Sequence, residues 1–211
     1  HMQSVYNRMT IGLLITGITA FIVSSSPALM ALIFGGPQMY IVAFAPDALV
    51  WFGFNPMSMS SQKLMVVFGA IAVLYGVSLS TLAFAFTGAE LTRAFFITAG
   101  MFAGLSIFGY TTKKDLSALG TFCVMGILGV FLISIVGMFV GFSSEIHFFL
   151  SVASVGLFAG VTAWETQSMR QMYRQAHGAE VNSRLAWSSA LSLYISFIAI
   201  FVNILQIMQE R

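Results

Sequence analysis

Long apolar runs separated by short polar interruptions make up almost the whole chain. Seven such runs cover residues 10–34, 39–54, 64–87, 93–112, 116–142, 146–169 and 185–208. Crossing the hydrocarbon core of a bilayer takes roughly 20 residues of helix, and most of the runs reach that length. Strands of an outer-membrane barrel would alternate apolar and polar residues, whereas these runs are solidly apolar. The pattern predicts an all-α polytopic membrane protein with seven transmembrane helices.

The interruptions predict where the helices break. Ser26-Pro27 predicts a kink inside the first run, and the Gly-Gly-Pro sequence at residues 35–37 predicts a tight turn. Pro46 and Asp47 interrupt the second run, which makes it the weakest of the seven. The longest hydrophilic stretch covers residues 170–184, and we expect it to form an exposed loop.

Composition supports the membrane assignment and excludes other classes. Of the 211 residues, 58% are hydrophobic and 8% are charged, against roughly 25% charged in an ordinary soluble domain. A net charge of +2 leaves no basic face for nucleic acid. We expect one transmembrane domain over residues 3–211, with His1-Met2 a remnant of an expression tag. The lone Cys123 lies in an apolar run and is expected to pack as a small hydrophobic side chain.

The positively charged residues predict the orientation in the membrane, because cytoplasmic loops carry an excess of Lys and Arg. With seven spans and a cytoplasmic N-terminus, seven of the nine cations fall on the inner side. If the second run only dips into the membrane, the split becomes six to three. The first arrangement fits better and predicts a cytoplasmic N-terminus.

Small and polar residues predict packing faces on the helices. Three pairs of glycines at a spacing of four should let helix backbones approach closely in lipid: Gly100 and Gly104, Gly137 and Gly141, and Gly156 and Gly160. The last run carries a stripe at spacings of three and four that should face protein or water: Ser192, Ser196, Ala199, Asn203 and Gln206. Ordinary hydrogen bonding between helices and a role in a transport path are equally good explanations of this stripe.

Two carboxyl groups are expected at membrane depth, where ionisable side chains are costly and mark candidate sites. Glu165 lies near the inner end of the sixth run, followed by a hydroxyl and an amide at Thr166 and Gln167. Such a carboxyl can exchange a proton or bind a cation; alternatively, it is a solvated acid at a helix end, paired with Arg170 or a nearby lysine. Asp47 lies within the second run, unless that span is displaced and the acid is interfacial.

Motifs of enzymes, metal centres and cofactor sites are missing from the sequence. It has no H-E-x-x-H, no Walker loop and no Gly-x-Ser-x-Gly elbow. His147 and His177 fall in turns, away from any membrane nucleophile, and the last run has no lysine for a retinal Schiff base. We therefore expect neither an enzyme nor a bound cofactor. Glu165 with nearby hydroxyls and carbonyls would form at most a weak calcium site, because calcium prefers six to eight oxygen ligands.

Three segments of the chain resemble the signatures of one known family. Residues 163–167, Ala-Trp-Glu-Thr-Gln, resemble the aromatic-Asp-Thr-Gln signature of the Bax inhibitor-1 (transmembrane Bax inhibitor motif) family. Residues 190–198, Ala-Leu-Ser-Leu-Tyr-Ile-Ser-Phe-Ile, resemble its Ala-Leu-x-Leu-Tyr-x-Asp-Phe-Ile segment. Residues 109–117 resemble its turn between spans four and five, in the form common among bacterial members. The likeness extends from about Arg8 to Met208.

The resemblance implies a fold in which the last of seven helices is central, with six around it. It also implies a calcium leak that depends on pH in some members, while other members act in stress tolerance or restrain a membrane protease. The leak is attached to a pair of aspartates, one in each signature, that share a proton. Here the first is Glu165 and the second is Ser196, so a shared-proton dicarboxylate cannot form. An arginine that the family tends to carry near the inner end of span two is missing from residues 54–58.

Two functions therefore stand as expectations for a protein of the bacterial inner membrane. In the first, the protein is a cation leak in which Glu165 and Ser196 form the gate and pH sensor, with a weak calcium site at Glu165. The path would be lined by Ser192, Asn203, Gln206 and Asp47. In the second, it transports nothing and binds a membrane partner, such as a quality-control protease, through its glycine-rich faces.

Overall fold

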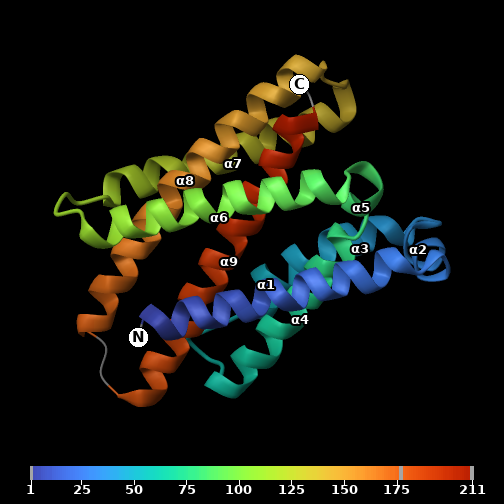
Figure 1. Cartoon of the computed structure of the whole chain (residues 1–211). Helices are drawn as coiled ribbons and strands as arrows, with labels where there is room; N and C mark the ends of the chain where they lie inside the picture. The colour runs from blue at the N-terminus through green and yellow to red at the C-terminus, as the bar shows by residue number, and fades with distance from the viewer. Residues whose placement is uncertain (1, 176–177, 210–211) are drawn as a thin grey trace. The chain divides into compact units, whose positions relative to one another are not determined.

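In the computed structural model, which describes residues 2–175 and 178–209, the regular elements are all helices (Figure 1). They are α1 Met2–Ser25, α2 Pro27–Phe34, α3 Gln38–Ala48, the π-helix η1 Leu49–Gly53, α4 Ser61–Leu79, α5 Leu82–Ala85, α6 Gly88–Thr111, α7 Ser117–Val140, α8 Ser144–Gln175 and α9 Ala179–Gln209. In lipid a helix is favoured because it satisfies its backbone hydrogen bonds internally.

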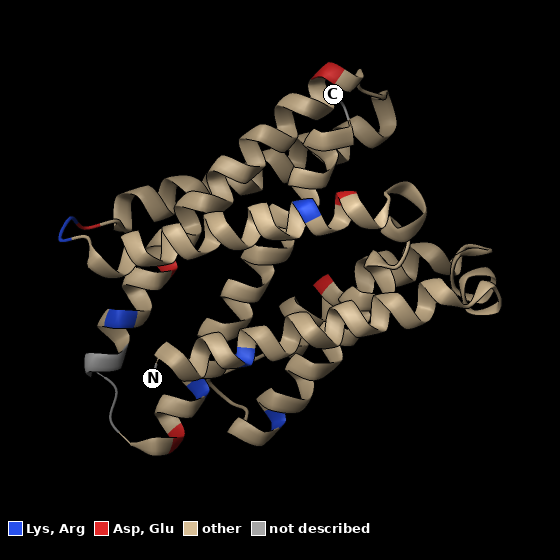
Figure 2. Ribbon diagram, viewed as in Figure 1, with Lys and Arg blue, Asp and Glu red and all other residues tan. Residues whose placement is uncertain are grey.

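Within the described residues, six helical segments are long and apolar enough to cross a membrane. A seventh span is formed if the pair Pro27–Phe34 and Gln38–Gly53, bent by 85°, crosses as one broken helix. The prediction of an all-α polytopic membrane protein is therefore confirmed. Figure 2 shows the charged residues mainly near helix ends, with long uncharged stretches between them.

Prolines and capping hydroxyls explain the broken second span. Ser26 separates α1 from α2, and its side chain accepts a hydrogen bond from the backbone N–H of Leu29 (3.4 Å) while Pro27 occupies the first turn of α2. The apolar run over residues 10–34 is therefore two helices. Pro46 lies inside α3 and cannot donate a backbone hydrogen bond, and three residues later the chain continues as the π-helix η1.

The long hydrophilic loop predicted over residues 170–184 is wrong. Helix α8 continues to Gln175 and α9 begins at Ala179, so most of this stretch is helical. At the start of α9, Glu180 forms an ion pair with Arg184 one turn away (3.3 Å) and accepts a hydrogen bond from the backbone N–H of Ser61 (2.9 Å). These polar contacts stabilise a helix where hydrophilic composition alone suggested a loop. His177 lies outside the described residues.

Contacts divide the chain into two compact units. Unit 1 lies within residues 1–88 and 175–194, and unit 2 lies within residues 89–174 and 195–211. Helix α9 contributes its first half to unit 1 and its second half to unit 2. Half of the most apolar stretch of α9 is buried, against a third or less in the other five spans. It is thus the most enclosed of the candidate spans.

Unit 1 is organised around the close packing of α1 on α4 (Figure 1). A Cβ atom at Gly12 would lie 2.7 Å from the ring of Phe68, so only glycine permits this approach. Tyr194 of α9 is fully buried and its ring lies edge-on to Phe68 and Tyr75, with centroids 5.6 and 5.9 Å away. Thr16 bonds the Tyr194 hydroxyl and donates to the carbonyl of Ala72 (2.8 Å). The polar groups at the centre of unit 1 thus bond to one another.

Candidate functional site

Glu165 on α8 and Ser196 on α9 meet inside unit 2. The Ser196 hydroxyl donates a hydrogen bond to the Glu165 carboxylate, with 3.2 Å between Oγ and Oε2. Ser196 is buried at 2% exposure, and Glu165 is half-buried. The two positions that the family resemblance pairs are therefore in contact, although one carries a hydroxyl instead of a carboxyl group.

Glu165 has no cationic partner within the described part of the chain. Arg170 is engaged elsewhere: its guanidinium donates to the backbone carbonyl of Tyr110 and lies 5.7 Å from the centre of that tyrosine ring. The alternative of a helix-end acid paired with Arg170 is therefore not what the structure contains. A half-buried carboxylate whose only described side-chain bond is to a hydroxyl retains lone pairs for a proton or a cation.

Gln167 joins the C-terminal half of α8 to the turn between α6 and α7. Its side-chain oxygen accepts from the backbone N–H of Leu116 (2.9 Å), and its side-chain nitrogen donates to the carbonyl of Lys114 (2.6 Å). In the same turn, Asp115 accepts hydrogen bonds from the backbone and hydroxyl of Ser117, which lower the pKa of Asp115. Sequence reasoning placed the Gln167 amide near the site but missed this bridging role.

Close helix contacts hold the two residues that precede Glu165. A Cβ atom at Gly109 of α6 would lie 2.2 Å from the backbone oxygen of Ala163, so α6 and α8 touch there through their backbones. A Cβ atom at Gly120 of α7 would lie 2.2 Å from the ring of Trp164. The two residues that precede Glu165 are therefore each seated on a glycine of a different helix.

The partner residue is positioned by α6. Phe197, which follows Ser196, packs against Phe102 and Phe95, with ring centroids 5.5 and 5.8 Å apart. Both rings come from α6, whose buried face also carries Thr98 and Ser106. These aromatic contacts orient the second half of α9 within unit 2 and hold the Ser196 hydroxyl toward α8.

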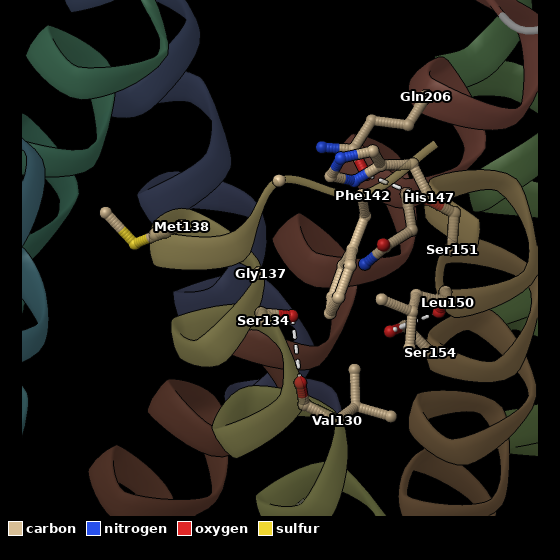
Figure 3. A pocket seen from close by; sticks show the side chains of 12 residues that line it. Val130, Ser134, Gly137, Met138, Phe142, His147, Leu150, Ser151, Ser154 and Gln206 are labelled. Atoms are coloured by element: carbon tan, nitrogen blue, oxygen red, sulfur yellow. Dashed lines mark hydrogen bonds between the residues drawn. The ribbon is translucent and has the colours of Figure 1, made fainter. Parts of the chain in front are cut away.

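Asn203 and Gln206 line a cavity of mixed polar and apolar character further along α9, about 550 Å³ in volume (Figure 3). The other walls are the end of α7 and the start of α8, including Ser134, His147 and Ser154. Ser192 belongs to the first half of α9, in unit 1, and is half-buried. The predicted stripe on α9 is therefore distributed over both units, and two of its members share one cavity.

Asp47 lies in unit 1 and is exposed, just before the π-helix η1. Its carboxylate accepts a hydrogen bond from the Tyr75 hydroxyl on α4 (2.6 Å), and the neighbouring turn of α4 is tethered by Ser78 to the carbonyl of Val42 (2.8 Å). Asp47 thus joins the broken span to α4. The sequence offered no sign that Tyr75, 28 residues away, would be its partner.

Only some of the predicted glycine contacts occur between helices. Gly160 meets α7, since a Cβ atom there would lie 2.4 Å from the Cys123 sulfur. Gly137 lies against the ring of Phe142, and Gly141 ends α7 with a φ of +76°, a conformation that favours glycine. In the described chain, a Cβ atom at Gly100, Gly104 or Gly156 would meet no atom within 4 Å. For these three residues the packing prediction does not hold within the chain.

The helices, their apolar surfaces and the buried polar contacts define a polytopic helical membrane protein. The family model described as "Inhibitor of apoptosis-promoting Bax1" matches residues 1–211. The chain therefore belongs to the Bax inhibitor-1 family, as its three signature-like segments indicated. These segments meet within unit 2. The segment at residues 109–117 is bonded to the segment at residues 163–167 through Gln167, and Glu165 accepts a hydrogen bond from Ser196 of the segment at residues 190–198.

Bacterial proteins resemble the chain over nearly its whole length. Inner membrane protein YbhL of Escherichia coli is 33% identical over all of this chain and 92% of its own. An uncharacterized protein of Caulobacter vibrioides is 37% identical over 95% of this chain and 84% of its own, and one of Rickettsia prowazekii is 36% identical over 100% and 89%. The printed name of the Escherichia coli relative agrees with the assignment to a membrane protein family.

Proposed function

We propose that this protein is a passive cation leak, calcium included, in a bacterial inner membrane, with its N-terminus in the cytoplasm. The observation that carries the proposal is Glu165: a half-buried carboxylate in a span, bonded to Ser196 and without a described ion pair. Such a group attracts a cation because the carboxylate is only partly hydrated and has no described counter-ion. Glu165 forms the inner gate or a weak calcium ligand, and Asn203 and Gln206 lie on the same path.

Glu165 and Ser196 supply at most three oxygen ligands, fewer than the six to eight that calcium prefers. Water would have to complete the coordination. Within the described residues there is also no cluster of three or more His, Cys, Asp and Glu that could hold a metal. A permeating cation must leave a site as readily as it enters, so weak coordination favours a leak over storage.

Calcium flux into proteoliposomes tests the proposal. Glu165→Gln preserves the size of the side chain and its bond to Ser196 but removes the charge. We expect flux to fall at least tenfold, since interactions with a charged group contribute roughly 1.5–3 kcal/mol and about 1.4 kcal/mol is a factor of ten. Glu145→Gln, in the exposed first turn of the same helix, is the matched control and should retain wild-type flux.

The flux proposal fails if wild-type vesicles leak no faster than empty ones, or if the two Glu→Gln variants behave alike. Orientation is a separate question. Reporter domains fused to either end of the chain should give a cytoplasmic signal at the N-terminus and an outer signal at the C-terminus.

A second candidate function is the binding and restraint of a membrane partner such as a quality-control protease. The observation that favours it is that Gly100 and Gly104, on one face of α6, are exposed, and that a Cβ atom at either would meet no atom of the described chain within 4 Å. In membranes such faces let a second helix approach closely. Gly100→Leu would abolish cross-linking to a partner and leave flux unchanged, whereas the leak proposal expects Glu165→Gln to have the reverse effects.

A further inference from the structure

The cavity in unit 2 lies well away from Glu165. Its lining comes from three places: the end of α7 and its following turn, the start of α8, and the second half of α9 (Figure 3). Along α8, Ser154 and Glu165 are 11 residues apart, about 16 Å at 1.5 Å per residue. A volume near 550 Å³ is large compared with the roughly 30 Å³ share of one water molecule in the liquid. The cavity therefore has room for an ion together with its hydration shell.

The serine hydroxyl groups on the cavity wall already donate hydrogen bonds to other groups of the protein. Ser134 donates to the carbonyl of Val130 (2.8 Å), Ser154 donates to that of Leu150 (2.8 Å), and Ser151 donates to the side-chain oxygen of Gln206 (2.9 Å). Figure 3 shows these three bonds around the cavity. A hydroxyl has one hydrogen and two lone pairs. Unless its existing hydrogen bond breaks, each of these serine oxygens can therefore act toward a ligand only as an acceptor.

Asn203 uses one of its two side-chain N–H groups in a bond to the carbonyl of Ala199 (2.7 Å), which leaves the other N–H as a donor and the side-chain oxygen as an acceptor. The donors that remain on the wall are this N–H of Asn203, the Gln206 amide nitrogen and the ring of His147, which packs edge-on to Phe142. Acceptor lone pairs still outnumber these donors, and among the described residues the lining contains no carboxylate and no Lys or Arg.

We propose that this cavity binds a hydrated inorganic cation through neutral oxygen atoms. The lone pairs of Ser134, Ser151, Ser154 and Asn203 face the ligand or the water in its first shell. Neutral oxygens bind calcium and alkali cations weakly, which suits an ion that passes on. This inference adds a second ion site on α8 and α9 to the proposed leak, and its role in transport rests on that proposal. Binding of the cation can be measured independently of flux.

Equilibrium titration of the full-length protein in nanodiscs tests the site. The reporter is the ring signal of His147 in protein labelled with ¹³C-histidine, assigned by its loss in His147→Gln; the other two histidines of the chain serve as internal references. Calcium chloride should shift the His147 signal saturably. N-methylglucamine chloride at the same chloride concentration should not, because that cation is too large to enter with a hydration shell.

Two variants carry the assignment to neutral oxygens. Ser134→Ala and Asn203→Leu should each raise the calcium dissociation constant roughly three- to tenfold, the loss expected for one acceptor. Thr121→Val is the matched control: its hydroxyl makes the same bond on the same helix, to the carbonyl of Ser117 (2.9 Å), but lies outside the cavity. It should leave the dissociation constant unchanged.

Equal, unsaturable shifts with both salts would overturn the site, as would calcium binding that neither Ser134→Ala nor Asn203→Leu weakens. The outcomes separate this site from the leak. Saturable calcium binding in a protein without flux would support the site and reject the leak. Calcium flux without a response of the His147 signal would support the leak and reject the site.

Discussion

Tyr194 and Ser196 are two residues apart on α9, yet one belongs to unit 1 and the other to unit 2. The Tyr194 hydroxyl is hydrogen-bonded to Thr16, which in turn donates to the backbone carbonyl of Ala72. Each polar atom in this series of hydrogen bonds therefore has a neutral partner. Ser196 instead donates to a carboxylate that has no described counter-ion. Buried polar groups that satisfy one another stabilise a fold, whereas a charge left partly uncompensated is costly and suggests function. Unit 1 therefore resembles a structural core and unit 2 a site.

The largest expected effect tests the structural half of this comparison. Tyr194→Ala removes a fully buried ring that packs on Phe68 and Tyr75, and should cost about 3–5 kcal/mol of stability, as for other large-to-small core changes. Thermal unfolding in detergent measures it. Tyr40→Ala, in the same unit at 57% exposure, is the control and should change the midpoint little. Similar losses in both variants would show that Tyr194 is not a core residue.

An intermediate effect is expected at the bridge that holds α8. Gln167→Ala leaves the N–H of Leu116 and the carbonyl of Lys114 without their partner, at about 1–3 kcal/mol for a buried unsatisfied group. Amide hydrogen exchange at Leu116 should accelerate. Gln38→Ala breaks a similar bond to the carbonyl of Leu32 (2.7 Å) at an exposed position and should cost less. Unchanged exchange at Leu116 would exclude the bridge.

A substitution at position 196 is expected to have the smallest effect on stability and to change the pH dependence of calcium flux. Ser196→Asp would place a second carboxyl group against Glu165, and two such groups titrate as a coupled pair. We expect the calcium flux to depend more steeply on pH between about 6 and 8 than in the wild type. Ser192→Asp, one turn earlier and in unit 1, is the control and should leave the pH profile unchanged. A profile unaltered by Ser196→Asp would remove the two-carboxyl explanation for this site.

Much of the fold was predictable because the signals are local. Solid apolar runs predict spanning helices, and Ser26-Pro27 and Pro46 mark the positions where α2 begins and α3 gives way to a π-helix. The prediction was wrong at residues 170–184, where hydrophilic composition suggested a loop. The contact of Glu180 with Ser61 there joins residues 119 positions apart, so no local pattern could reveal it.

The candidate site was predictable in part. The chemistry of Glu165 and its neighbours singled them out, and the family resemblance suggested Ser196 as the partner. The bridging role of Gln167, the bond of Tyr75 to Asp47 and the cavity in unit 2 were not foreseen, because each requires knowing which helix faces lie together. Glycine spacing was equally insufficient: Gly109 and Gly120 make close contacts around the site, while Gly100 and Gly104 make none within the described chain.

The sequence by itself determined that this is a helical membrane protein of the Bax inhibitor-1 family and singled out Glu165 and Asp47 as the candidate acids at membrane depth. Apolar length and family motifs are properties of contiguous residues, so they survive without any knowledge of packing. Tertiary structure alone decided which side chains bond across helices, such as Ser151 with Gln206, which glycines touch a neighbour and which polar groups line one cavity. These outcomes depend on the rotation and register of each helix against its neighbours, which the positions of residues along one helix do not specify.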